Sequence, residues 1–210
     1  MYGGALCIGT QRIPLPFADP YAPGVNDFEY GQTAKSRAAY GQATYALTDA
    51  LDLTLGIRHT KDKKSAFLYS QNIGASLPGH SIANPLRGKG DWSNTSYMGN
   101  LNYALTDDVR VYLTYATGYN GGGLNARAAT KAGFETPYNE EKVKSIEVGM
   151  KSQLLDNRLR LNVAAFHNVY TDMQVAQSEL GTGGASSKMV NAGEATIKGI
   201  EFDIVAVPLE

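Results

Sequence analysis

Residues able to do covalent or metal chemistry are few and far apart in this sequence of 210 residues. His59, His80 and His167 lack the spacing of metal ligands. Cys7 is the single cysteine, so no zinc cage, disulfide framework or Cys-x-x-Cys pair is available. Ser76 lies outside a Gly-x-Ser-x-Gly elbow, which argues against a nucleophilic serine. We therefore expect no catalytic residue, no metal site, no cofactor and no enzymatic activity.

Three consecutive glycines, Gly121–Gly123, could form a phosphate cradle. No Gly-Lys-Ser/Thr follows them and no helix start is evident, so a P-loop is not indicated. The glycines instead predict a sharp turn beside a neighbouring segment. Acid–base chemistry by paired carboxylates is also disfavoured, because strand positions that face water carry such charges routinely. The carboxylates concerned are Glu147, Glu194, Glu201 and Asp203.

Composition excludes several classes of protein. The 19 basic and 20 acidic residues leave a net charge of -1, which gives no electrostatic footprint for nucleic acid. Hydrophobic content of 43% argues against disorder. Apolar runs stay far below the ~20 residues of a transmembrane helix. Residues 1–10 carry no positive charge, so they do not resemble a targeting signal. We also expect the chain to be a fragment of a longer protein.

Polar and apolar residues alternate with a period of two, which predicts strands with one apolar face. The alternation is clearest in residues 51–58, 109–116, 159–166 and 200–207. Tyr45–Asp49 recurs as Tyr103–Asp107, each time as a short turn between two strands. Seven strands are predicted in all, at about 36–47, 51–69, 94–105, 109–119, 140–154, 159–176 and 188–207.

Short turns and long loops alternate between these strands. The turns carry Asp or Asn, whose side chains cap tight turns, and the long connections fall at about 71–93, 120–139 and 178–187. Short turns at one end and long loops at the other are typical of outer-membrane β-barrels. The strand from Val109 to Tyr119 spans about 33 Å at ~3.3 Å per residue. At a tilt of ~45° its height is roughly 23 Å, close to the ~25 Å apolar band of such barrels.

The two faces predicted for these strands differ in polarity. Outward aromatics fall at both edges of the apolar band, Tyr45 and Tyr103 near the turns and Tyr115 and Tyr119 near the loops. The run Lys61–Lys64 is interpreted as a hydrated strand extension above the membrane. The inward positions are too polar for a dry core; they are Asp52, Arg58, Asn100, Asn102, Arg110, Asn162, Glu201 and Asp203.

The predicted fold is therefore all-β, an antiparallel up-and-down meander that forms part of a large transmembrane outer-membrane β-barrel. Seven strands leave two open edges, which lipid does not tolerate, so further strands are required for closure. A soluble β-sandwich or a fibre-forming repeat remains the alternative fold.

Several segments resemble, in order, the barrel domain of TonB-dependent outer-membrane receptors of the siderophore type. They are Tyr115–Asn125 (YATGYNGGGLN), Glu140–Lys151 (EEKVKSIEVGMK), Leu159–Gln174, and Asn191–Glu201 with its N-x-G…A…G-x-E pattern. The resemblance covers about residues 30–210. Leu124 and Ile146 stand where the family usually has an aromatic residue.

The resemblance implies a function and a location. It implies TonB-energised uptake of iron–siderophore complexes or similar large nutrients at the outer membrane of a Gram-negative bacterium. The implied partners are the TonB complex, reached through a plug domain that this chain lacks, the nutrient ligand, and outer-membrane lipid. Residues 1–30 are expected to form an irregular segment or extracellular loop, and residues 31–210 the barrel segment.

The resemblance also places the region after Gly121 at the extracellular vestibule. Tyr119, Asn125 and Arg127 are thus the candidate ligand contacts, and the Arg127 guanidinium could fork onto a carboxylate or catecholate oxygen. A passive outer-membrane diffusion channel and a soluble β-sheet interaction protein stay open as alternative functions.

Overall fold

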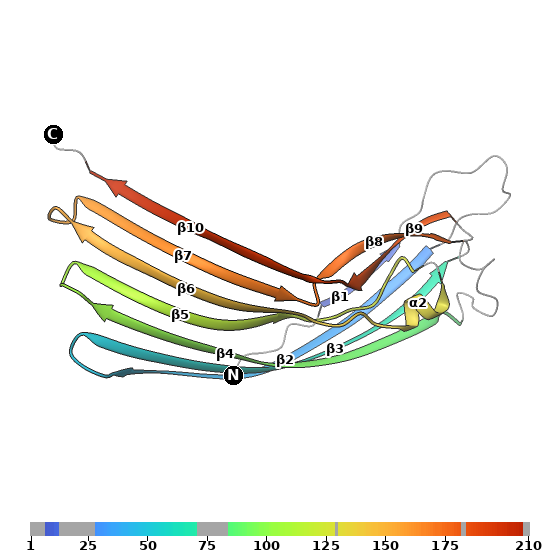
Figure 1. Ribbon diagram of the computed structural model, residues 1–210. Coiled ribbons are helices and arrows are strands. Elements are labelled where there is room, and N and C mark those ends of the chain that lie inside the picture. The colour runs from blue at the N-terminus through green and yellow to red at the C-terminus, as the bar shows by residue number, and fades with distance from the viewer. Residues whose placement is uncertain (1–6, 13–27, 71–83, 129, 182–183, 208–210) are drawn as a thin grey trace.

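The computed structural model describes residues 7–12, 28–70, 84–128, 130–181 and 184–207. An antiparallel sheet of eight strands, in the order β1-β2-β3-β4-β5-β6-β7-β10, curves into a trough (Figure 1), and β8 and β9 pair as a separate hairpin. The elements are β1 (Cys7–Arg12), β2 (Phe28–Ala46), β3 (Leu51–Ser70), β4 (Leu86–Ala104), β5 (Val109–Asn120), α2 (Lys131–Glu135), β6 (Glu141–Leu154), β7 (Leu159–Thr171), β8 (Gln174–Gly181), β9 (Gly184–Asn191) and β10 (Glu194–Ala206).

All seven predicted strands are present, and the all-β antiparallel meander is confirmed. Two predictions of strand length were wrong, because 159–176 and 188–207 are each divided into a sheet strand and a hairpin strand. The backbone leaves β7 at Asp172 (φ 55°) and enters β10 after Gly193 (φ 69°). These positive φ values break the extended conformation and turn β8 and β9 away from the sheet.

Two further strand segments differ from the expectation. β4 begins at Leu86, inside the connection expected at about 71–93. β1 lies within the stretch expected to be irregular and pairs with β2 from Cys7↔Ala34 to Arg12↔Glu29. The division of the chain near residue 30 stays a prediction.

The tight turns are closed by threonine side chains at two of the three predicted positions. Thr48 Oγ1 accepts hydrogen bonds from the backbone N–H groups of Ala50 (3.2 Å) and Leu51 (3.1 Å). Thr106 Oγ1 accepts from Asp108 N at 3.2 Å. The expected capping by Asp side chains was therefore wrong at these turns, where the hydroxyl of the preceding Thr does the capping.

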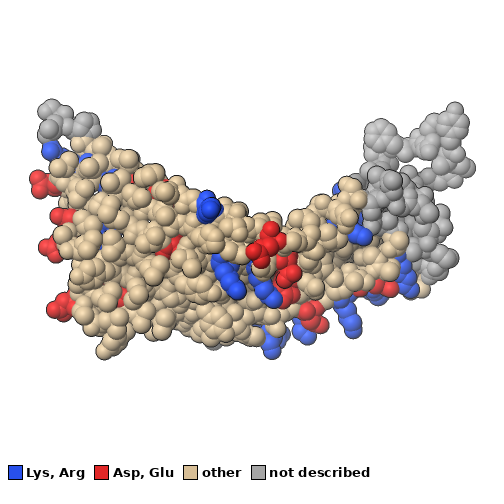
Figure 2. Space-filling view, in the orientation of Figure 1, with Lys and Arg blue, Asp and Glu red and all other residues tan. Residues whose placement is uncertain are grey.

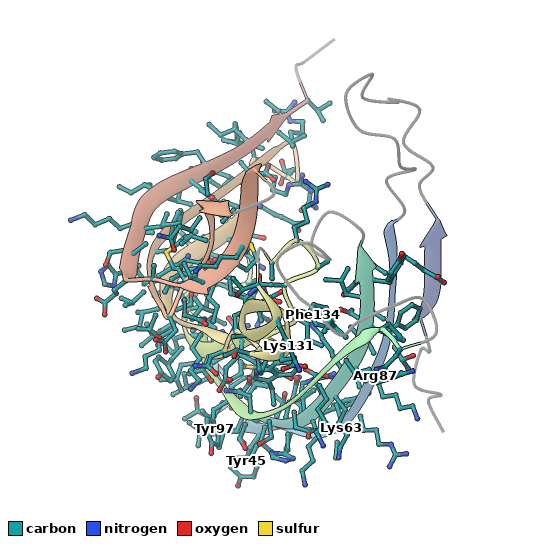
Figure 3. All side chains as sticks on the ribbon, turned by 90° about the vertical axis from the view of Figure 1, so that its right-hand side faces the viewer. Tyr45, Lys63, Arg87, Tyr97, Lys131 and Phe134 are labelled. Carbon is teal, nitrogen blue, oxygen red and sulfur yellow. The ribbon has the colours of Figure 1, made fainter. Side chains whose placement is uncertain are left out.

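The register separates the two faces of the sheet as the alternation predicts. Tyr45, Tyr97 and Lys63 point from the convex face, whereas Phe134 lies inside the trough (Figure 3). The expected inward polar residues share the concave face, where Thr44 pairs with Thr54 (2.8 Å) and Asn100 donates to Thr114 (2.8 Å).

The convex face carries an apolar band between the turns and the middle of the strands. Its exposed side chains include Leu55, Ile57, Leu113, Tyr115, Ile146, Val148, Ile200, Phe202 and Ile204. Figure 2 shows few charged side chains over this half of the surface, apart from acidic residues along the edge formed by the turns. An apolar patch of this extent is typical of a surface that meets lipid or a partner. No helix in the described ranges is long and apolar enough to cross a membrane.

Candidate functional site

The segment 121–139, between β5 and β6, folds over the concave face at the loop end of the sheet. Phe134 of α2 is completely buried, and Leu124 is 6% exposed. Both belong to one hydrophobic cluster with Leu68 of β3 and Leu86 of β4. Figure 3 shows α2 inside the trough, with Phe134 directed toward the sheet. This end of the concave face therefore has a dry core of its own.

The glycine run lets this segment approach the sheet closely. Gly123 and Tyr138 form a two-way backbone bridge, with Gly123 N donating to Tyr138 O (3.2 Å) and Tyr138 N to Gly123 O (3.0 Å). Gly122 lies between the Tyr138 carbonyl and the Trp92 indole so tightly that a Cβ atom would collide with both. Burial raises the pKa of the Tyr138 phenol above its ordinary value. The expected sharp, close-packed turn is found here.

Polar side chains of β3 on the concave face contact segment 121–139 and the end of β5. Lys64 Nζ donates to the Gly122 carbonyl at 2.6 Å and stands 5.6 Å from the centroid of the Trp92 ring. Tyr119 donates a hydrogen bond from its hydroxyl to Asp62. Tyr119, expected among the outward aromatics, thus reaches the concave face.

The run Lys61–Lys64 is divided between the two faces. Lys61 and Lys63 are on the convex side, whereas Asp62 and Lys64 face the trough and make the contacts described above. Interpreting the whole run as a hydrated extension was therefore wrong for its even-numbered residues. The strict alternation of β3 carried the signal that would have found them.

The β8–β9 hairpin is fastened to segment 121–139 by side-chain amides. Asn125 is 8% exposed, and its side chain meets the backbone of Met189 twice: Asn125 Nδ2 donates to Met189 O (3.2 Å), and Met189 N donates to Asn125 Oδ1 (2.6 Å). Asn191 accepts from Asn139 N (2.6 Å) and donates to Asn139 O (3.0 Å).

Gln174, at the start of β8, completes this fastening. Its side-chain Nε2 donates to the carbonyls of Asn120 (3.3 Å), Gly121 (3.3 Å) and Asn139 (3.0 Å). We call the side chains of Asn125, Gln174 and Asn191 the amide clasp. Gln174 and Asn191 belong to segments of the family resemblance, but the sequence did not reveal their contacts with residues 120–139, which lie 35 to 54 residues away in the chain.

The three predicted ligand contacts have different surroundings. Tyr119 is partly buried and bonded to Asp62, and Asn125 is buried with its amide occupied by Met189. Arg127, two residues further on, is exposed. All three belong to one continuous part of the loop end, and of the three only Arg127 is an exposed residue.

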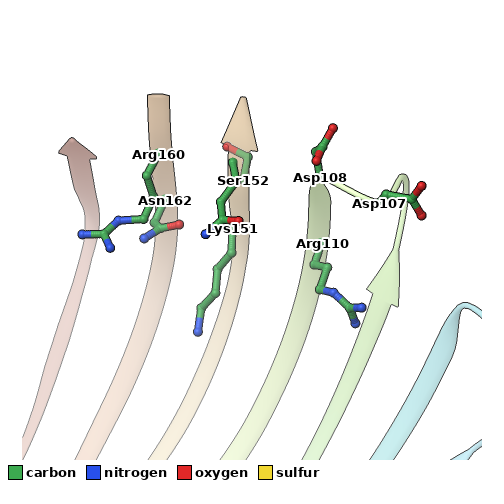
Figure 4. A pocket seen from close by; sticks show the side chains of 8 residues that line it. Asp107, Asp108, Arg110, Lys151, Ser152, Arg160 and Asn162 are labelled. Atoms are coloured by element: carbon green, nitrogen blue, oxygen red, sulfur yellow. The ribbon is translucent and has the colours of Figure 1, made fainter. Parts of the chain in front are cut away.

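The turn end of the concave face has an open recess of about 250 Å³ (Figure 4). Three cationic side chains line it, Arg110, Lys151 and Arg160, and all are exposed. Arg160 pairs loosely with Asp203 at 3.7 Å. Lys151 lies 5.5 Å from the centroid of the Tyr112 ring. The recess is open to water and is lined by positive charges, and it does not enclose a reaction site.

The part of the chain that the structure describes contains no candidate metal site. No group of three or more His, Cys, Asp or Glu side chains is close enough there to hold an ion. His59 instead hydrogen-bonds Thr95 through Nδ1 (2.9 Å). The predictions about His80 and Ser76 lie outside the described residues.

Comparison with known families identifies the class to which this sheet belongs. The family described as "TonB dependent receptor-like, beta-barrel" matches residues 6–207, almost the whole chain. The chain is therefore a member of the TonB-dependent receptor β-barrel family. The resemblance noted in the sequence and the barrel-type fold are both confirmed, and the family consists of receptors and transporters of the Gram-negative outer membrane.

Individual relatives agree with this assignment. The chain is 32% identical over 196 residues to the pesticin receptor of Yersinia enterocolitica, covering 92% of this chain and 26% of that protein. It is 29% identical to the catecholate siderophore receptor Fiu of Escherichia coli K12, covering 83% and 26%. The crystal structure of the ferric yersiniabactin uptake receptor FyuA from Yersinia pestis aligns with a TM-score of 0.67 and 27% identity, over 85% of this chain and 25% of that one. The chain thus spans about a quarter of the length of these relatives.

Proposed function

We propose that the protein to which this chain belongs is an outer-membrane receptor that imports iron–siderophore complexes with energy supplied through TonB. Family membership supports this, together with relatives whose names refer to ferric yersiniabactin, catecholate siderophores and pesticin. The chain contributes part of the barrel wall in a Gram-negative outer membrane. Its role is binding and passage, with no bond made or broken.

The observation that carries the proposal is the asymmetry of the concave face. A polar wall is covered at its loop end by a packed segment, and this segment presents Arg127 to solvent. An exposed guanidinium can recognise the carboxylate, catecholate or phenolate oxygens of a ferric siderophore. In this proposal Tyr119 and Asn125 position the loop end, through Asp62 and Met189, close to the bound ligand.

The proposed partners follow from the two faces and from the family. The convex band contacts outer-membrane lipid, and the loop end contacts the nutrient. TonB acts through a plug domain elsewhere in the protein. Nucleic acid is not a partner, since the net charge is -1.

The test uses the full-length protein in a strain whose own siderophore receptors are deleted. Uptake of radiolabelled ferric yersiniabactin and of a ferric catecholate is expected, and depletion of TonB should abolish it. The Arg127→Ala variant should bind its ferric siderophore at least about tenfold more weakly, since hydrogen bonds to charged groups contribute ~1.5–3 kcal/mol.

The matched control is Lys131→Ala. Lys131 is an exposed cation of the same segment, paired with Glu135 at 3.8 Å, and its loss should leave binding unchanged. Uptake that persists without TonB, with non-selective ion conductance in planar bilayers, would indicate a passive diffusion channel. Folded protein that stays in the aqueous phase without detergent would indicate a soluble interaction protein.

A further inference from the structure

Four cations are gathered on the convex face of β2 and β3, directly beyond the apolar band. The register places Arg37 opposite Lys61 and Lys35 opposite Lys63. We call these four residues the convex cation cluster. With Ala38, Ala39 and His59 they line an open recess of about 600 Å³.

The charges of this cluster are poorly balanced. Like charges directly opposite each other on neighbouring strands destabilise a sheet, and the cluster holds two such pairs. Of these four residues, only Lys63 makes an ion pair with a described residue, Asp91 at 3.4 Å, and both side chains are about two-thirds exposed or more. Such a pair contributes little in water. Glu29 lies on the same face of β2 but about 20 Å from Lys35 along the strand, at ~3.3 Å per residue.

The position of the cluster along the strand indicates what could balance it. On the convex face of β3, apolar Leu53, Leu55 and Ile57 are followed by His59 and then by Lys61 and Lys63. Where the apolar residues contact acyl chains, the residues that follow along the strand, Lys61 and Lys63, lie at the depth of the lipid headgroups. Basic clusters at that depth attract anionic lipid, with a contribution of about 1 kcal/mol per Lys or Arg. The Arg37 guanidinium can in addition bind phosphate in a bidentate manner.

We propose that the convex cation cluster is a binding site for the phosphate group of an anionic membrane lipid. The phosphate accepts from Arg37, Lys61 and Lys35, and the acyl chains of the same molecule lie along the apolar band below. A lipid is favoured over free phosphate because the recess is continuous with that band through Ala39 and His59. The inference rests on the membrane placement proposed above and is independent of the transported nutrient.

The experiment uses the full-length protein reconstituted in phosphatidylcholine bilayers. Association of spin-labelled phosphatidic acid is compared with that of spin-labelled phosphatidylcholine by electron spin resonance. The wild-type protein should prefer phosphatidic acid, and the double variant Arg37→Gln/Lys61→Gln should lose about thirtyfold of that preference. An uptake assay on the same variant separates this inference from the proposed function, because transport is expected to persist.

The matched control is the double variant Lys144→Gln/Lys198→Gln. These lysines lie on the same convex face, on β6 and β10, and stand opposite Thr117 and Val169 or His167 rather than another Lys or Arg. The control should change the preference less than about twofold. Equal losses in both variants, or no preference in the wild type, would overturn the proposal. Full competition by millimolar inorganic phosphate would overturn the assignment to lipid.

Folding of the variants can be checked independently. Removing opposed like charges relieves repulsion, so Arg37→Gln/Lys61→Gln should unfold in pure phosphatidylcholine at the wild-type temperature or slightly above it. The single variant Lys35→Gln provides a milder perturbation of the same site. It should lose part of the preference for phosphatidic acid, and an unchanged preference there would count against the site.

Discussion

The two ends of the concave face are held in different ways. At the loop end, segment 121–139 buries Leu124 and Phe134 against β3 and β4, and a glycine lies against Trp92. At the turn end, Arg110 and Lys151 stand exposed over an open recess. The geometry of the loop end is thus fixed by packing within this chain, whereas side chains at the turn end hardly constrain one another. Substitutions should therefore have large effects at the loop end and small ones at the turn end.

The largest effect is expected from Phe134→Ala. The side chain is completely buried in the loop-end cluster, and removing a buried Phe costs about 3–5 kcal/mol. The free energy of local opening of residues 121–139, measured by hydrogen–deuterium exchange on the full-length protein, should fall by an amount of this order. Phe134→Leu is the control and should retain most of the protection. Unchanged exchange in Phe134→Ala would show that the segment is held from elsewhere.

A smaller loss is expected from Gly122→Ala, about 1–3 kcal/mol, because the new methyl group is forced into a filled space. Its Cβ meets the backbone carbonyl of Tyr138, which cannot move without breaking the bridge to Gly123. Gly41→Ala on β2 is the matched control, since nothing lies within 4 Å of a Cβ there. Exchange of the Tyr138 amide is the measurement, and equal effects of the two substitutions would contradict the close packing at Gly122.

Breaking the amide clasp should lower the local stability of the hairpin by an amount no larger than that expected for Gly122→Ala. Asn125→Ala removes two hydrogen bonds to Met189, each with a net contribution of about 0.5–1.5 kcal/mol. Faster exchange of the Met189 amide is expected, with no change in the β3–β4 strands. Asn125→Asp keeps the acceptor for Met189 N and loses the donor to Met189 O, so an intermediate rate should follow. A rate identical to that of the Ala variant would exclude the accepting oxygen as a contributor.

The turn end should tolerate a comparable change. Arg110→Gln alters an exposed side chain of the recess, and such substitutions usually shift stability by less than about 0.5 kcal/mol. The unfolding temperature of the full-length protein and the exchange of residues 109–116 should stay at wild-type values. A loss similar to that of Asn125→Ala would mean that the two ends are held alike.

The sequence was sufficient to predict most of the sheet and little of the loop end. A period of two placed seven strands and most side chains on their faces, because alternation and short turns are local signals that the sequence displays directly. The kink at Asp172 escaped prediction, since Asp is enriched among residues with positive φ but adopts this conformation too rarely for one residue to predict a kink. α2 has five residues, too few to show an apolar stripe, and it is stabilised by the burial of Phe134.

The contacts of the candidate site could be predicted from the sequence less well than the strands. Asn125 was proposed as a ligand contact because the family resemblance places the region after Gly121 at the extracellular vestibule, and this contact stays a prediction. Nothing in the sequence indicated that its amide is bound to Met189, 64 residues away in the chain. Asp62 and Lys64 were missed because Lys61–Lys64 was interpreted as one hydrated run, although the alternation of β3 places these two residues on the concave face.

The chemical nature of the amide clasp has a consequence for the conditions under which the loop end stays assembled. Side-chain amides neither titrate nor carry charge, so acidity and ionic strength should hardly change the contacts that Asn125 and Asn191 make. A carboxylate also contacts the start of β8, because Glu141 accepts from the backbone Gln174 N at 2.8 Å. By contrast, the ion pair of Lys131 with Glu135 is exposed and weakens as salt rises. The joint between the β8–β9 hairpin and segment 121–139 should therefore keep its strength in media that differ widely in pH and salt.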